Sequence, residues 1–147
     1  MGLEGVFIIS CAEGNFNLFV PPNAAEGFPG VPLQCMPPGP PPTFVRIQNC
    51  GGDKYELIPT NFRHHHVIAS LNNSVPKLLH LVTKEHDGLC TEWAIDRAGG
   101  DIYNIRATSG PGDECWTLNG GPGGVIELKS ADGGDTQKWR LIPVQED

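Results

Sequence analysis

The chain has 147 residues, of which 39% are hydrophobic, and a formal charge of −7 from 10 basic and 17 acidic residues. This length suits one domain with a core of its own. The acidic balance argues against a nucleic-acid backbone or an anionic membrane as the main partner, because both attract clusters of Lys and Arg. No run reaches the roughly 18 apolar residues that are needed to span a membrane.

Short strand patterns separated by turn residues follow one another along the chain, and none has a convincing helical period. The 19 glycines and 14 prolines fall mostly between these patterns and indicate turns. About twelve short strands predict an all-β sandwich or barrel. The predicted strands are 6–12, 16–20, 31–36, 43–49, 54–59, 64–71, 77–83, 89–96, 101–108, 114–118, 125–129 and 137–144.

One arrangement of residues recurs along the sequence. The segments 43–60 and 91–108 share a strand, a Gly-Gly turn and a following Tyr, 48 residues apart. A step of 48 residues backwards from Tyr55 reaches Phe7, and a step of 46 residues forwards from Trp93 reaches Trp139. A period of this size indicates repeat architecture. Three pseudo-repeats of four strands predict a β-trefoil, with a six-stranded barrel and a hairpin cap. We expect a single β-trefoil domain over residues 1–147, with repeats of about 1–52, 53–100 and 101–147.

The five cysteines are an odd number and include no CxxC pair. The first residues lack the basic start and long apolar run of a signal peptide. Secreted disulfide frameworks use even sets of cysteines, so we expect free thiols and a cytoplasmic location.

Three stretches resemble known fungal β-trefoil proteins. The triplet Gln137-Lys138-Trp139 resembles the QxW signature of ricin-B-like lectins. The opening Leu3–Ile9 resembles the start of mushroom protease inhibitors, and Val31–Tyr55 is similar to the cospin-type serine protease inhibitors in its Pro-rich connector and following strands. The mycocypins, which inhibit cysteine proteases, share the fold and the N-terminal pattern. The resemblance implies a protease inhibitor that binds through exposed loops, serine proteases first and cysteine proteases second.

The loop Pro21–Gly30 is the first candidate for protease contact. A prestiffened loop loses little conformational entropy when it binds, and this loop carries prolines near both ends. The resemblance to cospin-type inhibitors implies a trypsin-binding role here, but no Lys or Arg lies between Pro21 and Gln34. A plain surface loop is the alternative. The candidate contact residues are Asn23, Ala24, Ala25, Glu26 and Phe28.

The turn that follows Thr60 is the second candidate. Arg63 suits a trypsin-like pocket, and it follows Asn61 and Phe62. The resemblance to mycocypins implies that Asn61 lies near the residue that blocks asparaginyl endopeptidase. Asn72 on the next turn is a further candidate. The alternative is ordinary turn chemistry, because Asn favours turns by bonding to its own backbone.

Carbohydrate binding is the alternative function. Lectin repeats of the ricin type use an Asp, an aromatic platform and an Asn before the signature Gln. Thr117, the pair Leu128-Lys129 and Thr136 stand at those places here. Tryptophan in such a chain also belongs often to the core. The candidates for a different sugar site are Trp116, Asn119 and Asp135.

No cofactor or metal site is predicted. The run His64-His65-His66 puts two imidazoles on one face of a strand, but no acid or Cys is placed beside them by the sequence. Surface or cross-strand packing is therefore favoured. No GxSxG, HExxH or GxxxxGK[ST] motif occurs, so an enzyme is the least supported class. The expected partner is a target protease, with a glycan as the alternative and neither nucleic acid nor membrane.

Overall fold

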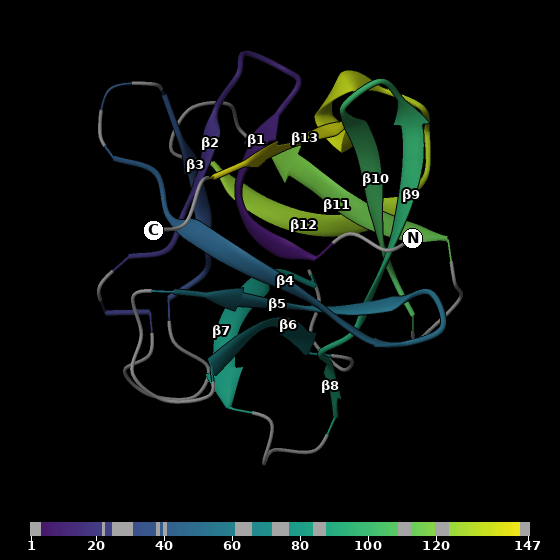
Figure 1. Cartoon of the computed structure of the whole chain (residues 1–147). Helices are drawn as coiled ribbons and strands as arrows, with labels where there is room; N and C mark the ends of the chain where they lie inside the picture. Colours follow the sequence, from purple (N-terminus) through teal and green to yellow (C-terminus); the bar gives the residue numbers. More distant parts are fainter. Residues whose placement is uncertain are drawn as a thin grey trace.

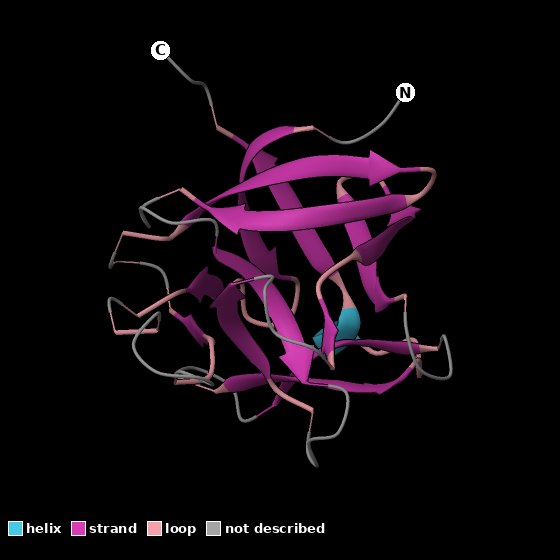
Figure 2. Cartoon of the chain, turned by 90° about the horizontal axis from the view of Figure 1, so that it is seen from below, coloured by secondary structure: helices cyan, strands magenta, loops and turns pink. Residues whose placement is uncertain are grey.

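A computed structural model describes residues 4–21, 23–24, 31–37, 39, 41–60, 66–71, 77–83, 88–108, 113–119 and 124–144. Within these ranges it contains thirteen β-strands and one helical turn (Figures 1 and 2). The prediction of an all-β chain is confirmed, and no helix in the described ranges is long and apolar enough to cross a membrane. The strands are β1 (Gly5–Cys11), β2 (Asn17–Phe19), β3 (Gln34–Met36), β4 (Phe44–Gly51), β5 (Lys54–Pro59), β6 (His66–Leu71), β7 (Leu79–Thr83), β8 (Leu89–Cys90), β9 (Trp93–Gly99), β10 (Ile102–Ala107), β11 (Glu114–Asn119), β12 (Val125–Ser130) and β13 (Trp139–Pro143), and the 3-10 helix η1 is Asp135–Gln137.

Six strands close into a ring. β1 pairs with β4 and β13, β5 pairs with β4 and β9, and β10 pairs with β9 and β13, all in antiparallel register. The first and last of these strands meet through five residue pairs, from Phe7 opposite Pro143 to Cys11 opposite Trp139. A closed ring has no exposed strand edge at which another chain could pair.

The remaining long strands form three hairpins, β2–β3, β6–β7 and β11–β12, which bond to one another. The Leu33 N–H donates to the Leu79 carbonyl at 2.9 Å, linking the first hairpin to the second. The Leu128 N–H donates to the Lys77 carbonyl at 2.8 Å, linking the third hairpin to the second. β12 also pairs with β3. The hairpins therefore meet as a set, and Figure 1 shows β6 and β7 below β4 and β5.

Residues one repeat apart face the same core. Ile9, Leu57 and Ile105 are spaced by 48 residues, lie on β1, β5 and β10, and are each 0% exposed. Because side chains alternate across a strand, this shared phase directs one face of each strand inwards. The repeat seen in the sequence is thus a repeat of core positions.

Three tryptophans fill the centre of this core. Trp93, Trp116 and Trp139 are each 0% exposed. The ring centroids of Trp93 and Trp116 are 5.5 Å apart and those of Trp116 and Trp139 are 5.7 Å apart, with both pairs edge to face at 85°. Edge-to-face pairs add to the free energy gained by burial alone. The tryptophans therefore hold β9 and β13 of the ring against β11.

The backbone angles explain why each of the two turns contains a Gly-Gly pair. Gly51 and Gly52 have φ of 126° and 57°, and Gly99 and Gly100 have φ of 140° and 56°. Only glycine adopts such angles at little cost. The two hairpin tips are therefore near copies of each other, as their sequences suggest.

Three strand predictions differ from the structure. The expected strand 31–36 starts later, at Gln34, where β3 begins. The expected strand 89–96 is divided, because β8 pairs with β6 whereas β9 pairs with β5 and β10. The expected strand 137–144 starts later, at Trp139, because Asp135–Gln137 forms the helical turn η1, drawn in cyan in Figure 2. In the last two places the chain passes through polar residues that belong to no strand, Thr91-Glu92 and Gln137-Lys138, before the next strand begins.

All five cysteines are free thiols, and only Cys50 is exposed. Burial raises the pKa of the Cys11 thiol from 9.0 to about 11, and this effect outweighs a backbone hydrogen bond at Glu13 that lowers the pKa. Burial also raises the pKa of Cys35 and of Cys115. The folded protein therefore keeps these thiols protonated at a pH where an unfolded chain loses their protons.

We expect the free energy of unfolding to fall as the pH rises from about 9 to about 11. In that window the unfolded chain binds fewer protons than the folded chain, so the free energy of unfolding decreases with rising pH. Below about pH 8 the thiols are protonated in both states, so they do not change the stability. Urea unfolding at several alkaline pH values measures the slope. The Cys11→Ala variant should show a shallower slope, and an unchanged slope would contradict the assignment to Cys11.

Candidate functional site

The connection from β2 to β3 begins in a fixed turn. The Ala24 N–H donates to the Pro21 carbonyl at 2.9 Å, and Ala24 is 0% exposed and packs in the core. Asn23, one residue earlier, is exposed. A buried residue thus anchors the turn, and Asn23 is held at the surface beside the barrel. This differs from the expectation that Ala24 contacts a protease.

A surface pocket of about 240 Å³ adjoins this turn. The Thr43 hydroxyl accepts a hydrogen bond from the Val20 N–H at 2.9 Å, and the Thr60 N–H donates to the Phe44 carbonyl at 3.0 Å. These bonds join three connections: the one that follows β2, the one that precedes β4 and the one that follows β5. The lining residues are Phe19, Val20, Pro41, Pro42, Thr43, Phe44 and Thr60.

Both predicted loops leave the barrel at this pocket. Val20 precedes the loop Pro21–Gly30, and Thr60 precedes the turn with Arg63. The loop residues Ala25, Glu26, Phe28, Asn61, Phe62, Arg63 and Asn72 lie outside the described residues, so their roles stay predictions.

Phe44 is the functional candidate that sequence reasoning missed. It is 42% exposed, and it is one of three large hydrophobic side chains exposed in the described ranges. On β4 the inward residues are Val45 and Ile47, and Phe44 shares the outer face with Arg46 and Gln48. An aromatic residue in the polar phase of an alternating strand was the available signal.

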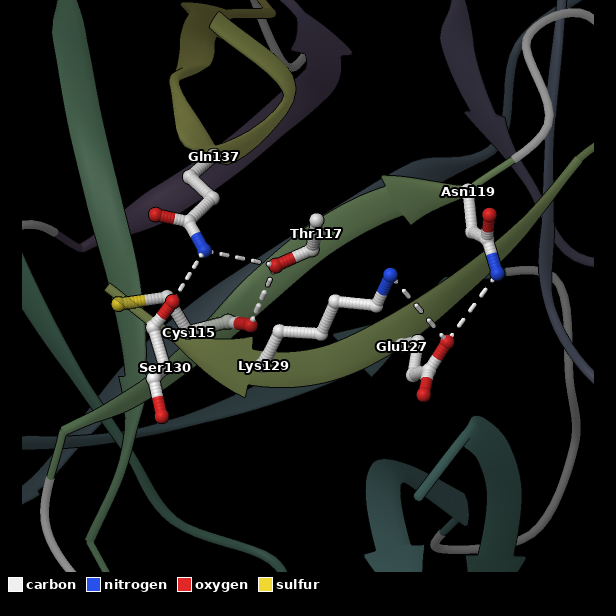
Figure 3. A network of polar contacts seen from close by, with 7 residues as sticks. All are labelled: Cys115, Thr117, Asn119, Glu127, Lys129, Ser130 and Gln137. Atoms are coloured by element: carbon white, nitrogen blue, oxygen red, sulfur yellow. Dashed lines mark hydrogen bonds and ion pairs between the residues drawn. The ribbon is translucent and has the colours of Figure 1, made fainter. Parts of the chain in front are cut away.

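A polar network covers the outer face of β11 and β12 (Figure 3). Gln137 is 1% exposed; its amide nitrogen donates to the Thr117 hydroxyl at 3.1 Å and to the Ser130 carbonyl at 2.9 Å. Its amide oxygen accepts from the Asp132 N–H at 2.7 Å. The signature Gln therefore fastens the segment before β13 to the third hairpin. Its role in this structure is to fix the backbone that leads into β13 against β11 and β12.

The three residues predicted for a sugar site make other contacts in the structure. Trp116 is fully buried between two other tryptophans, so its ring is closed to a sugar. The Asn119 amide donates to the Glu127 carboxylate at 3.1 Å. Asp135 lies on η1 and pairs with Lys138 at 3.6 Å. The Trp116 ring is not available as an aromatic platform, because stacking on a sugar requires an exposed ring face.

His66 is the described member of the histidine run. It lies in β6 opposite Thr83 and is partly buried. His64 and His65 lie outside the described residues. The expectation of cross-strand packing therefore stays a prediction for the run as a whole.

Comparison with solved structures shows the fold. No family model matches the chain, and no curated protein matches it. The BEL beta-trefoil is similar to it with a TM-score of 0.71 and 14% identity, over 98% of this chain and 97% of that chain. This chain has the β-trefoil fold. The likeness is structural only, since the identity is below the level at which function can be carried over.

Two further structures show how differently this fold is used. The proteinase inhibitor from Coprinopsis cinerea is similar with a TM-score of 0.77 and 10% identity, over 98% of this chain and 100% of that chain. The Macrolepiota procera ricin B-like lectin, solved with lactose, is similar with a TM-score of 0.73 and 14% identity, over 98% and 100%. The trefoil scaffold supports either function, so the choice depends on this chain's own surface.

Proposed function

We propose that the chain is a proteinaceous inhibitor of proteases that binds through the connections around the Phe44 pocket, serine proteases first and cysteine proteases second. The observation that supports the proposal is that Val20 and Thr60, which directly precede the two predicted loops, line one pocket together with the exposed Phe44. Protein interfaces centre on apolar and aromatic residues surrounded by polar contacts. Phe44 supplies the apolar centre, and the loop residues supply the surrounding contacts.

The anchored turn supports the same proposal. A loop that is held in one conformation before binding loses less entropy on binding, so more of the contact energy appears as affinity. Buried Ala24 and its hydrogen bond to Pro21 hold the start of the first loop. Asn23 is therefore presented by a fixed backbone, and Arg63 offers a cation to a trypsin-like pocket.

The test is an inhibition assay against trypsin, chymotrypsin, papain and asparaginyl endopeptidase. We expect at least one of them to be inhibited, and we expect Phe44→Ser to weaken that inhibition by about tenfold or more, as truncation of a central interface residue does. Ile142→Ser is the matched control, because Ile142 is 39% exposed and lies outside the pocket. If Arg63→Ala also weakens trypsin inhibition, the second loop is assigned.

Carbohydrate binding is the second candidate. The observation in its favour is the polar row on β11 and β12 shown in Figure 3, in which the exposed Asn119 and Lys129 flank the half-buried Glu127. A carboxylate and an amide side by side suit vicinal sugar hydroxyls. A glycan array decides between the candidates: binding that Asn119→Ala abolishes, with no protease inhibited, would overturn the inhibitor proposal.

A further inference from the structure

Three side chains that can bind metal converge on the outer face of the barrel, away from the Phe44 pocket. They are Cys50 near the tip of the β4–β5 hairpin, Glu56 in β5 and Glu92 just before β9. Their ligand atoms, one sulfur and two carboxylate oxygens, all lie within 4.8 Å of one another. Ligand atoms around a tetrahedral zinc ion lie roughly 3.5 Å apart, so small side-chain rotations complete the geometry.

The strand register creates this group. Tyr55 lies opposite Trp93 in the antiparallel pair β5–β9, which places the next residues, Glu56 and Glu92, opposite each other on the outer face. The register between β4 and β5 shifts between Asn49 and Gly51. Cys50 is the extra residue at that irregularity. A β-bulge re-aims a side chain, and here it leaves the thiol beside both carboxylates.

The electrostatics of the group favour a cation. Like charges directly opposite each other on neighbouring segments are destabilising, and the carboxylates of Glu56, which is 7% exposed, and Glu92 lie close together. No ion pair is formed by the Glu92 carboxylate with any residue in the described ranges. A divalent ion between the two carboxylates would offset the repulsion between them.

We propose that Cys50, Glu56 and Glu92 bind one divalent transition-metal ion, with Zn²⁺ as the representative ion. A thiolate ligand selects zinc and its neighbours over Mg²⁺ and Ca²⁺, which require oxygen ligands. The Cys50 sulfur lies 3.8 Å from the Gln48 carbonyl, and the thiol gives up its proton when the metal binds. Three protein ligands leave a fourth position for water.

Neighbouring residues fix the backbone of one ligand and surround the group. The Thr108 hydroxyl donates to the Glu92 carbonyl at 2.9 Å, which fixes the backbone that carries this ligand. A cavity of about 330 Å³ is lined by residues next to the group, among them Gly51, which follows Cys50, and Thr108, which bonds to Glu92. Lys54 and Arg106 also line this cavity and both lie opposite Ala94, two positions along from the two carboxylates. This site is independent of the proposed inhibitor function.

Titration with Co²⁺ under reducing conditions tests the proposal on the full chain. A cobalt–thiolate bond gives an intense near-ultraviolet charge-transfer band, which binding to histidine or carboxylate alone does not give. We expect this band to saturate at one equivalent, to be lost in Cys50→Ser, and to need about tenfold more Co²⁺ in Glu92→Gln. Circular dichroism confirms that both variants are folded, which their surface positions favour.

Asp113→Asn is the control, since Asp113 is an exposed acid outside the group and its loss should leave the band unchanged. Competition with Zn²⁺ should displace the cobalt and abolish the band. Two results would overturn the proposal: Co²⁺ binding without a thiolate band, or a band that persists in Cys50→Ser. Neither result bears on protease inhibition, which is measured separately.

Discussion

Replacing Trp116 with alanine should lower the free energy of unfolding by about 3–5 kcal/mol, the range observed when a buried large aromatic is removed. Trp116 is 0% exposed and contacts both Trp93 and Trp139 edge to face. The variant loses the burial of one ring and both aromatic contacts, and a cavity remains among side chains that come from different strands. Urea denaturation followed by circular dichroism measures the loss.

Conservative replacements separate packing from hydrogen bonding at this centre. The Trp139 Nε1 donates to the Trp116 carbonyl at 3.0 Å, whereas the Trp116 Nε1 is buried and has no partner within the described residues. Trp139→Phe leaves a buried carbonyl without its donor and should cost about 1–3 kcal/mol more than its change in volume alone. Trp116→Phe removes no hydrogen bond and should cost less than Trp139→Phe. The reverse order would show that this hydrogen bond contributes little.

Replacing Gln137 with methionine should destabilise the fold by about 2–4 kcal/mol, because the side chain keeps its length and loses all its polar contacts. The buried amide bonds to Thr117, Ser130 and the Asp132 backbone, so its removal takes these bonds from the buried Thr117 hydroxyl and from two partly buried backbone groups. Thermal and urea unfolding measure the effect.

A neighbouring amide provides the control for Gln137. The Asn104 amide donates one hydrogen bond, at 2.7 Å, to the Gln137 carbonyl and is only partly buried. Asn104→Ala should therefore cost about 1 kcal/mol, close to the value of one ordinary hydrogen bond. Equal losses in the two variants would contradict the idea that the three-bond side chain fastens η1 to the third hairpin.

The sequence was sufficient for the fold class because the core positions repeat. Ile9, Leu57 and Ile105 occupy one phase of three strands, and their spacing of 48 is visible without coordinates. The same information could not separate a core tryptophan from a surface one. Trp116 was placed in a sugar site because its strand offers two faces, and strand pairing decides which face is inward.

The sites were harder to predict, because they depend on pairing between distant segments. Phe44 was visible as an apolar residue in a polar phase, but the pocket around it needs β2, the Pro-rich connector and the end of β5 together. Cys50, Glu56 and Glu92 form no motif, and only the bulge and the register of β5 with β9 bring them together.

Ring closure by β1 and β13 has a consequence for biosynthesis. β13 is the last of the thirteen strands to leave the ribosome, so until then β1 lacks one of its two neighbours in the ring. Residues so far apart in the chain pair slowly, and the edge of β1 stays unpaired until β13 is in place. We expect nascent chains of this protein to bind holding chaperones until β13 has left the ribosome.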